Sequence, residues 1–314
     1  MFPKAEFEDY DFIVHAIAHY PKYRPHQINS VITIVREYIE NETFRKLFIE
    51  KCSKICPVLV FLLNNHGLIR FDEVIDELKC PKNLLLCYYF HNQIEDFASF
   101  IAKHNEPAFS DKQFLNDTEN LDAMIQYGFL PSSVEYCLKY DDISSLKQHL
   151  IDPMELKRKK TIEWCPFEWT ERPDIFGQAP DLLSFAGLFG SIECFKMLML
   201  NGFPINQTVT RYVCASGSFD LFHLCYKPSM NLTDLAAIAS QYGQIEILRY
   251  LIEQKAPIND QDHSWCPKTP LQCAAHSGLL FIVDFLINEK SNPNGPNMRV
   301  FIGFLMKLRF TLPH

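Results

Sequence analysis

Four residues toward the C-terminal end have the types and the spacing of metal ligands. His263, Cys266, Cys273 and His276 follow the pattern H-x2-C-x6-C-x2-H. Thiolate and imidazole groups are ligands that zinc commonly takes in proteins, so the quartet predicts a zinc site if all four side chains converge. The same stretch also contains Thr-Pro-Leu at 269–271, followed by an alanine pair and a glycine, which is typical of one unit of a helical repeat. The elements around the quartet decide between these interpretations.

A template of apolar residues recurs along the chain. Counted from Gly278, apolar side chains lie two, five, eight and nine residues later, and an asparagine lies sixteen residues later. The same offsets hold when the count starts at Gly243 or at Gly190. Steps of three and four residues place these side chains on one face of a helix. Weaker copies start from three further anchors, Gly217, Asp141 and Asn92.

Each clear unit also has a characteristic beginning. A residue that can cap a helix lies nine positions before the glycine, and these residues are Asp181, Asp234 and Thr269. Such side chains accept hydrogen bonds from the unpaired amides of a first helical turn. An alanine lies four positions before each glycine, where a small side chain allows close packing. Each unit is therefore predicted to be a short helix, a tight turn and a longer second helix.

The other segments complete the predicted domain organisation. Apolar residues at helical spacing predict helices within 26–40, 43–52 and 71–78. Such helices would cover the open end of the stack. The last segment either closes the stack with a short apolar helix or is the altered end of a longer array, which would make the chain a fragment. The predicted division is 1–80 as a helical N-terminal region, 81–152 as divergent helix pairs, 153–180 as a long loop containing tryptophan and proline, 181–294 as repeats and 295–314 as an irregular segment.

The stretch KTPLQCAAHSGLLFIVDFLINEKSNPN (268–294) resembles the ankyrin repeat, with Gln272 where histidine is usual. Residues 234–259 and 181–206 also resemble ankyrin repeats, although they lack the Thr-Pro pair. The whole chain resembles the divergent ankyrin proteins of protozoa that carry a helical N-terminal region. The resemblance implies an all-α solenoid of stacked helix pairs that binds a protein through its hairpin tips and concave helix face. It implies no catalytic residue and no cofactor.

The repeat alignment separates the four candidate metal ligands. Cys273 lies at a position where the other units have apolar residues, so it is predicted to be core, and His276 lies at a variable position. Only His263 and Cys266 remain on the preceding loop, and we therefore favour the absence of a metal. No phosphate-binding loop, H-E-x-x-H or G-x-S-x-G motif is present. A metal-stabilised or cysteine-dependent enzyme stays as the alternative, because catalytic groups are recognised by geometry and not by order.

A Trp-Cys-Pro triplet occurs at 164–166 and again at 265–267. Tryptophan at an exposed tip is a suitable binding anchor, since aromatic side chains dominate the energetics of interfaces. The same side chain can instead pack on a neighbouring loop, and the sequence does not choose between the two. Short spacings between units predict an interruption of the concave surface near 206–234. The predicted binding residues are His263, Ser264, Trp265, Lys268, Trp164 and Trp169.

The composition limits the class of partner. The formal net charge of −8 opposes general attraction to nucleic-acid phosphates and to anionic membranes. The start has acidic residues where a signal peptide needs a basic region, so we expect no secretion, and the apolar run at 56–63 is too short to cross a bilayer. Eleven scattered cysteines fit reduced thiols. We expect a cytoplasmic monomer with another protein as partner.

The basic run 157–160 is either a nuclear-import or anion-binding patch or a solvated loop.

Overall fold

The computed structural model describes most of the chain and divides it into two compact units. One unit comprises residues 1–130 and 165–171, and the other comprises 131–164 and 172–314. The predicted segment 81–152 spans the boundary between them. Every regular element in the described residues is a helix. The described residues are 10–11, 13–15, 17–19, 28–103, 118–131, 133–151, 156, 162, 165–168, 180–264 and 267–292.

The first unit is built from short helices joined by tight turns. The Asn41 side chain accepts a hydrogen bond from the Phe44 amide and so starts α3, while Pro57 opens α4 directly after Cys56. Helices are found in the three predicted stretches 26–40, 43–52 and 71–78. The elements are α2 (Ile28–Arg36), α3 (Glu42–Ile55), α4 (Pro57–Asn65), η2 (Phe71–Glu73), α5 (Ile75–Leu78), η3 (Pro81–Asn83), α6 (Leu84–Tyr89), α7 (Phe97–Ala102) and α9 (Thr118–Tyr127).

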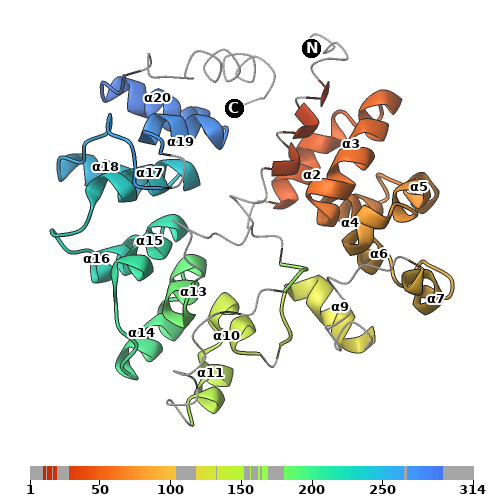
Figure 1. Ribbon diagram of the computed structural model, residues 1–314, viewed down its shortest axis with the longest axis horizontal. Helices are drawn as coiled ribbons and strands as arrows, with labels where there is room; N and C mark the ends of the chain where they lie inside the picture. Colours follow the sequence, from red (N-terminus) through yellow and green to blue (C-terminus); the bar gives the residue numbers. More distant parts are fainter. Residues whose placement is uncertain are drawn as a thin grey trace. The chain divides into compact units, whose positions relative to one another are not determined.

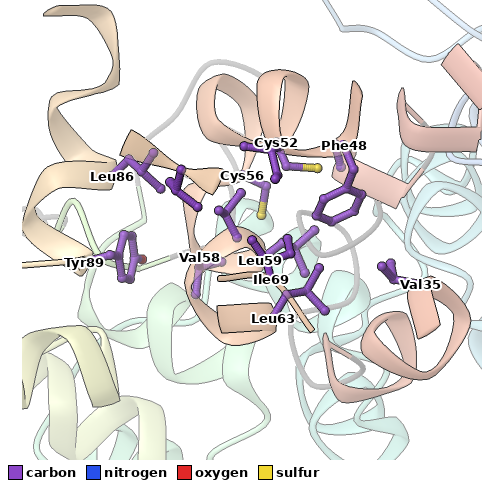
Figure 2. Close-up of a cluster of buried hydrophobic side chains, with 14 of the residues drawn as sticks. Val35, Phe48, Cys52, Cys56, Val58, Leu59, Leu63, Ile69, Leu86 and Tyr89 are labelled. Carbon is purple, nitrogen blue, oxygen red and sulfur yellow. The ribbon is translucent and has the colours of Figure 1, made fainter. Parts of the chain in front are cut away.

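The core of this unit gathers side chains from α2, α3, α4 and α6 (Figure 2). Phe48 and Cys52 of α3 and Leu59 and Leu63 of α4 are all almost fully buried. Cys56, at the junction of the two helices, is buried with them. Both cysteines therefore belong to the apolar core of this unit.

The second unit consists of helix pairs that stack in sequence order (Figure 1). The first helix of each pair packs against the first helix of the next pair, so that α10, α13, α15, α17 and α19 form one continuous layer. The second helix of each pair lies on its own first helix. The helices are α10 (Val134–Tyr140), α11 (Ile143–His149), α13 (Leu182–Phe189), α14 (Ile192–Leu200), α15 (Gln207–Ser216), α16 (Phe219–Cys225), α17 (Leu232–Tyr242), α18 (Ile245–Glu253), α19 (Pro270–His276) and α20 (Leu280–Asn288).

The predicted anchors lie at equivalent turns between the two helices of a pair. Gly190, Gly217, Gly243 and Gly278 all have a positive φ, and each follows a first helix. Asp141 takes the same left-handed conformation between α10 and α11, so a carboxylate replaces glycine there. These positions confirm the predicted turns. They also identify the copy anchored at Asp141 as a member of the stack.

Asp141 has a second role that a glycine could not perform. Its carboxylate accepts hydrogen bonds from the backbone amides of Glu193, at 3.2 Å, and Cys194, at 2.8 Å, in the first turn of α14. The residue before α14, Ser191, turns its hydroxyl away and donates to the Leu138 carbonyl of α10. The α10/α11 pair is therefore joined to the next pair through the orphan amides of a helix start.

Two local predictions differ from the structure. Asp234 does not cap its helix, because α17 starts earlier and the Asn231 side chain accepts from the amides of Thr233 and Asp234. The predicted anchor Asn92 lies in the turn after α6, but the left-handed residue in that turn is Asp96. The capping predictions at Asp181 and Thr269 are confirmed, with bonds to the third residue of each helix.

Candidate functional site

The connections between successive helix pairs differ in length. Residues 201–206 join α14 to α15, and residues 226–231 join α16 to α17. Each ends on an asparagine whose side chain caps the next helix; Asn206 accepts from the Val209 amide at 3.0 Å. Residues 254–269, here called the finger, join α18 to α19 and form a much longer connection. Among these three connections, the finger is therefore the longest.

One aspartate, Asp262, forms hydrogen bonds with residues of the finger on both sides of Trp265. Asp262 is nearly buried, and its Oδ1 accepts from the Ser264 amide at 3.2 Å, the Ser264 hydroxyl at 2.7 Å and the Lys268 amide at 3.1 Å. The Asp262 amide donates in return to the Lys268 carbonyl at 3.0 Å. One carboxylate thus joins Ser264 on one side of the loop to Lys268 on the other.

A second aspartate joins the finger to the helices beneath it. Asp234 in the first turn of α17 is 2% exposed, and its Oδ2 lies 2.7 Å from Nη2 of Arg211 in α15. Its Oδ1 accepts from the His263 amide at 3.0 Å and lies 2.9 Å from His263 Nδ1. A buried carboxylate requires such donors because its charge is no longer solvated by water. Asp234 therefore connects α15, α17 and the finger.

The structure describes three of the six predicted binding residues. The His263 side chain is 67% exposed at the start of the loop that Asp262 closes. Ser264 and Lys268 are half-buried, and their backbone amides are directed to Asp262. Trp164, Trp169 and Trp265 lie outside the described residues, so the proposed role of the tryptophans stays a prediction.

The candidate metal ligands occupy different environments. Cys273 is 2% exposed within α19, which confirms the prediction that it belongs to the core. His276 is exposed in the last turn of the same helix, whereas His263 is bonded to Asp234. Cys266 lies outside the described residues. Within the part of the chain that the structure describes, no three residues of the histidine, cysteine, aspartate and glutamate types are grouped as metal ligands would be.

The thiols of the helix layers are held in the protonated form. Burial raises the pKa of Cys137 to about 11 and that of Cys225 to about 12, and it raises the pKa of Cys214 further still. Cys87 in the first unit has a pKa raised to about 12 by the same cause. A nucleophilic cysteine needs the opposite shift, toward thiolate at neutral pH. These four thiols are therefore structural.

Three residues of the site were not predicted from the sequence: Asp262, Asp234 and Arg211. Asp262 left a usable signal, because an aspartate two residues before a serine in a loop is typical of a side chain that bonds the backbone just ahead of it. The sequence carries no comparable signal for Asp234 or Arg211 as residues of this site. They lie in successive helix pairs, 23 residues apart, and only the stacking of α15 on α17 brings them together.

None of the helices in the described residues is both long enough and apolar enough to span a membrane.

Residues 183–297 match a family described as ankyrin repeats, in three copies. The matched region begins within α13 and continues past α20, so the α10/α11 pair extends the stack beyond the match. No curated protein matches the chain.

Proposed function

We propose, from the premise that residues 183–297 are ankyrin repeats, that this chain is a non-catalytic scaffold which binds another protein through the finger and the adjoining first helices. Ankyrin repeats generally mediate protein–protein interaction and are typically not enzymes. The net charge of −8 favours a protein over a nucleic acid as partner. The chain acts as a monomer in this proposal, with no cofactor.

The observation that carries the proposal is the set of hydrogen bonds that hold the described residues of the finger. Two aspartates hold it, Asp262 within the loop and Asp234 from the helix below. A loop that is already ordered loses less conformational entropy when a partner binds, and this increases affinity. The connections at 201–206 and 226–231 are shorter and run directly into the next helix, so the binding energy is expected to be concentrated around His263.

The test compares the full chain with a finger variant. Affinity capture identifies candidate partners, and each is then purified and titrated against the full chain by calorimetry. The variant His263→Ala/Ser264→Ala/Lys268→Ala should bind at least tenfold more weakly. The control is Glu193→Ala/Lys196→Ala, which removes an exposed ion pair from α14, on a second helix. It should bind like the wild type.

Equal binding by the wild type and the finger variant would refute the finger as the binding site. A loss confined to the control would place the site on the second helices instead. Circular dichroism of both variants shows whether any loss of binding is due to unfolding.

A further inference from the structure

The His263 ring has a fixed orientation although most of it is exposed. Nδ1 lies 2.9 Å from Oδ1 of Asp234, and the His263 backbone amide donates to the same oxygen. The side chain of Asp234 is 2% exposed, whereas that of His263 is 67% exposed. No bond to Nε2 of His263 is recorded among the described residues. One edge of the ring is therefore anchored and the other edge is presented outward.

The proton of the neutral ring is located by the contacts of Nδ1. If Nδ1 carried a lone pair, it would face a buried carboxylate oxygen at 2.9 Å, and two acceptors would repel each other. If Nδ1 carries the proton, it donates a charge-assisted bond to Asp234. The Asn231 amide nitrogen lies 3.2 Å from Nδ1, but a neutral donor at that distance stabilises less than the carboxylate.

Arg211 strengthens this assignment. Its Nη2 lies 2.7 Å from Oδ2 of Asp234, and a guanidinium is only a hydrogen-bond donor, so this contact occupies Oδ2. Oδ1 then remains an acceptor, and the group that meets it must be a donor. The tautomer of His263 is in this way linked to a residue of α15, two helix pairs before α19.

We propose that Asp234 is a positioning residue which holds neutral His263 in its Nδ1–H tautomer, so that the finger offers its partner a hydrogen-bond acceptor at Nε2. The inference rests on the proposed function, because it assumes that the partner contacts the finger. The partner group that meets Nε2 is then a donor, such as a backbone amide, an indole N–H or a guanidinium. A carboxylate or a carbonyl at that place is disfavoured while His263 is neutral.

Nitrogen NMR of the full chain tests the tautomer without any partner. At about pH 8.5, above the range where imidazoles ordinarily titrate, protonated and bare ring nitrogens give well separated signals. The His263 signals are assigned by their absence in His263→Asn. We expect a protonated Nδ1 and a bare Nε2 in the wild type, and a shift toward the Nε2–H form in Asp234→Asn.

Asp260→Asn is the matched control, since Asp260 is an exposed aspartate of the same finger and no side-chain bond from it to His263 is recorded in the described residues. It should leave the ring signals unchanged. A wild-type ring with a bare Nδ1 would overturn the proposal, as would an Asp234→Asn variant that folds and keeps the wild-type signals.

Two further variants separate the two edges of the ring in the binding assay. In His263→Asn the amide can still donate to Asp234, but no atom replaces Nε2. In His263→Gln the longer amide replaces the outer edge and the bond to Asp234 is weakened. The proposal expects at least a fivefold loss of affinity for a finger-binding partner in His263→Asn, with partial recovery in His263→Gln.

Wild-type affinity in His263→Asn would overturn the acceptor role of Nε2 while leaving the scaffold function intact. If no partner needs the finger at all, the proposed function fails, and the NMR result still stands by itself. The two failures are therefore distinguishable.

Discussion

The connections that lead into α15 and α17 differ from the one that leads into α19. In the first two, an asparagine ends the connection and caps the next helix at once. In the third, the chain first forms the finger, and a Thr269 and Gln272 capping box starts the helix. The comparison teaches that the same stack carries two kinds of connection: short ones that end on the cap of the next helix, and a longer one whose own residues are held by hydrogen bonds before the next helix starts.

One template position shows how the two kinds diverge. Asn206 and Asn259 both lie sixteen residues after a turn glycine. Asn206 caps α15, whereas Oδ1 of Asn259 accepts from the Asn292 amide at 2.7 Å, beyond α20. The same residue therefore starts a helix in a short connection and holds the following unit in place in the long one.

The largest expected effect concerns the helix layers that both kinds of connection share. The pKa of Cys137 rises from 9.0 to about 11 and that of Cys225 to about 12 on folding, because burial disfavours the thiolate. A raised folded-state pKa stabilises the protein below pH 9, and this stabilisation is lost as pH rises toward 11–12. Urea midpoints measured from pH 8 to 11 should fall steeply.

The double variant Cys137→Ala/Cys225→Ala should show a shallower fall above pH 9 than the wild type. An unchanged slope would mean that these thiols ionise equally in the folded and unfolded states. Neither Cys137 nor Cys225 lies in the finger, so the variants at His263, Ser264 and Lys268 should keep the wild-type slope between pH 8 and pH 9.5.

The second effect breaks the long connection at its base. Asp234→Ala removes the carboxylate that pairs with the half-buried guanidinium of Arg211 and removes two bonds to His263. We expect a loss of about 3 kcal/mol in the free energy of unfolding, the lower end for a broken buried pair. Denaturant titration measures it.

The companion variant Arg211→Met/Asp234→Leu removes both charges together and should recover part of this loss. A double variant less stable than Asp234→Ala would show that the contacts of the pair itself, and not the charge that remains at Arg211, account for the effect.

The third effect sharpens the contrast between the two asparagines. Asn206→Ala removes a helix cap and should cost about 1 kcal/mol. Asn259→Ala removes one exposed bond to a backbone amide, and we expect a loss of about 0.5 kcal/mol. Equal losses in thermal unfolding would contradict the different roles that the structure assigns to them.

The smallest effect concerns how each connection begins. Gly202 and Lys255 occupy the same place after α14 and α18, and both have a positive φ, of 80° and 65°. A lysine is strained in this conformation and a glycine is not, so Lys255→Gly should stabilise the protein by up to about 1 kcal/mol. Gly202→Lys should destabilise it by a similar amount, and a melting temperature that moves the other way in either variant would refute the interpretation.

Much of the helix stack could be predicted from local sequence. The positive φ at Gly190 and the cap at Asp181 both follow from side-chain chemistry within a few residues. The α10/α11 pair was harder to identify because Asp141 replaces the glycine. An aspartate tolerates the left-handed conformation, and the apolar spacing around it still indicated the helices.

The error at Asp234 has a physical cause. An aspartate at the expected offset is a good cap, but Asn231 is an equally good one three residues earlier, and Asn231 starts the helix. Propensity alone does not choose between two adjacent caps. Which of the two residues caps α17 depends on tertiary contacts, because the Asp234 carboxylate pairs with Arg211 and His263 and is not available to the helix amides.

The sequence by itself determined the helix pairs, their turns and the class of fold, because caps, left-handed residues and apolar periodicity act over one or two helical turns. It also placed Cys273 in the core, since the same position is apolar in unit after unit. Only the tertiary structure decided that Asp234 lies under the finger and orients His263. A buried charge takes its partners from whatever the stacked helices bring within hydrogen-bond distance, and that set is not local in sequence.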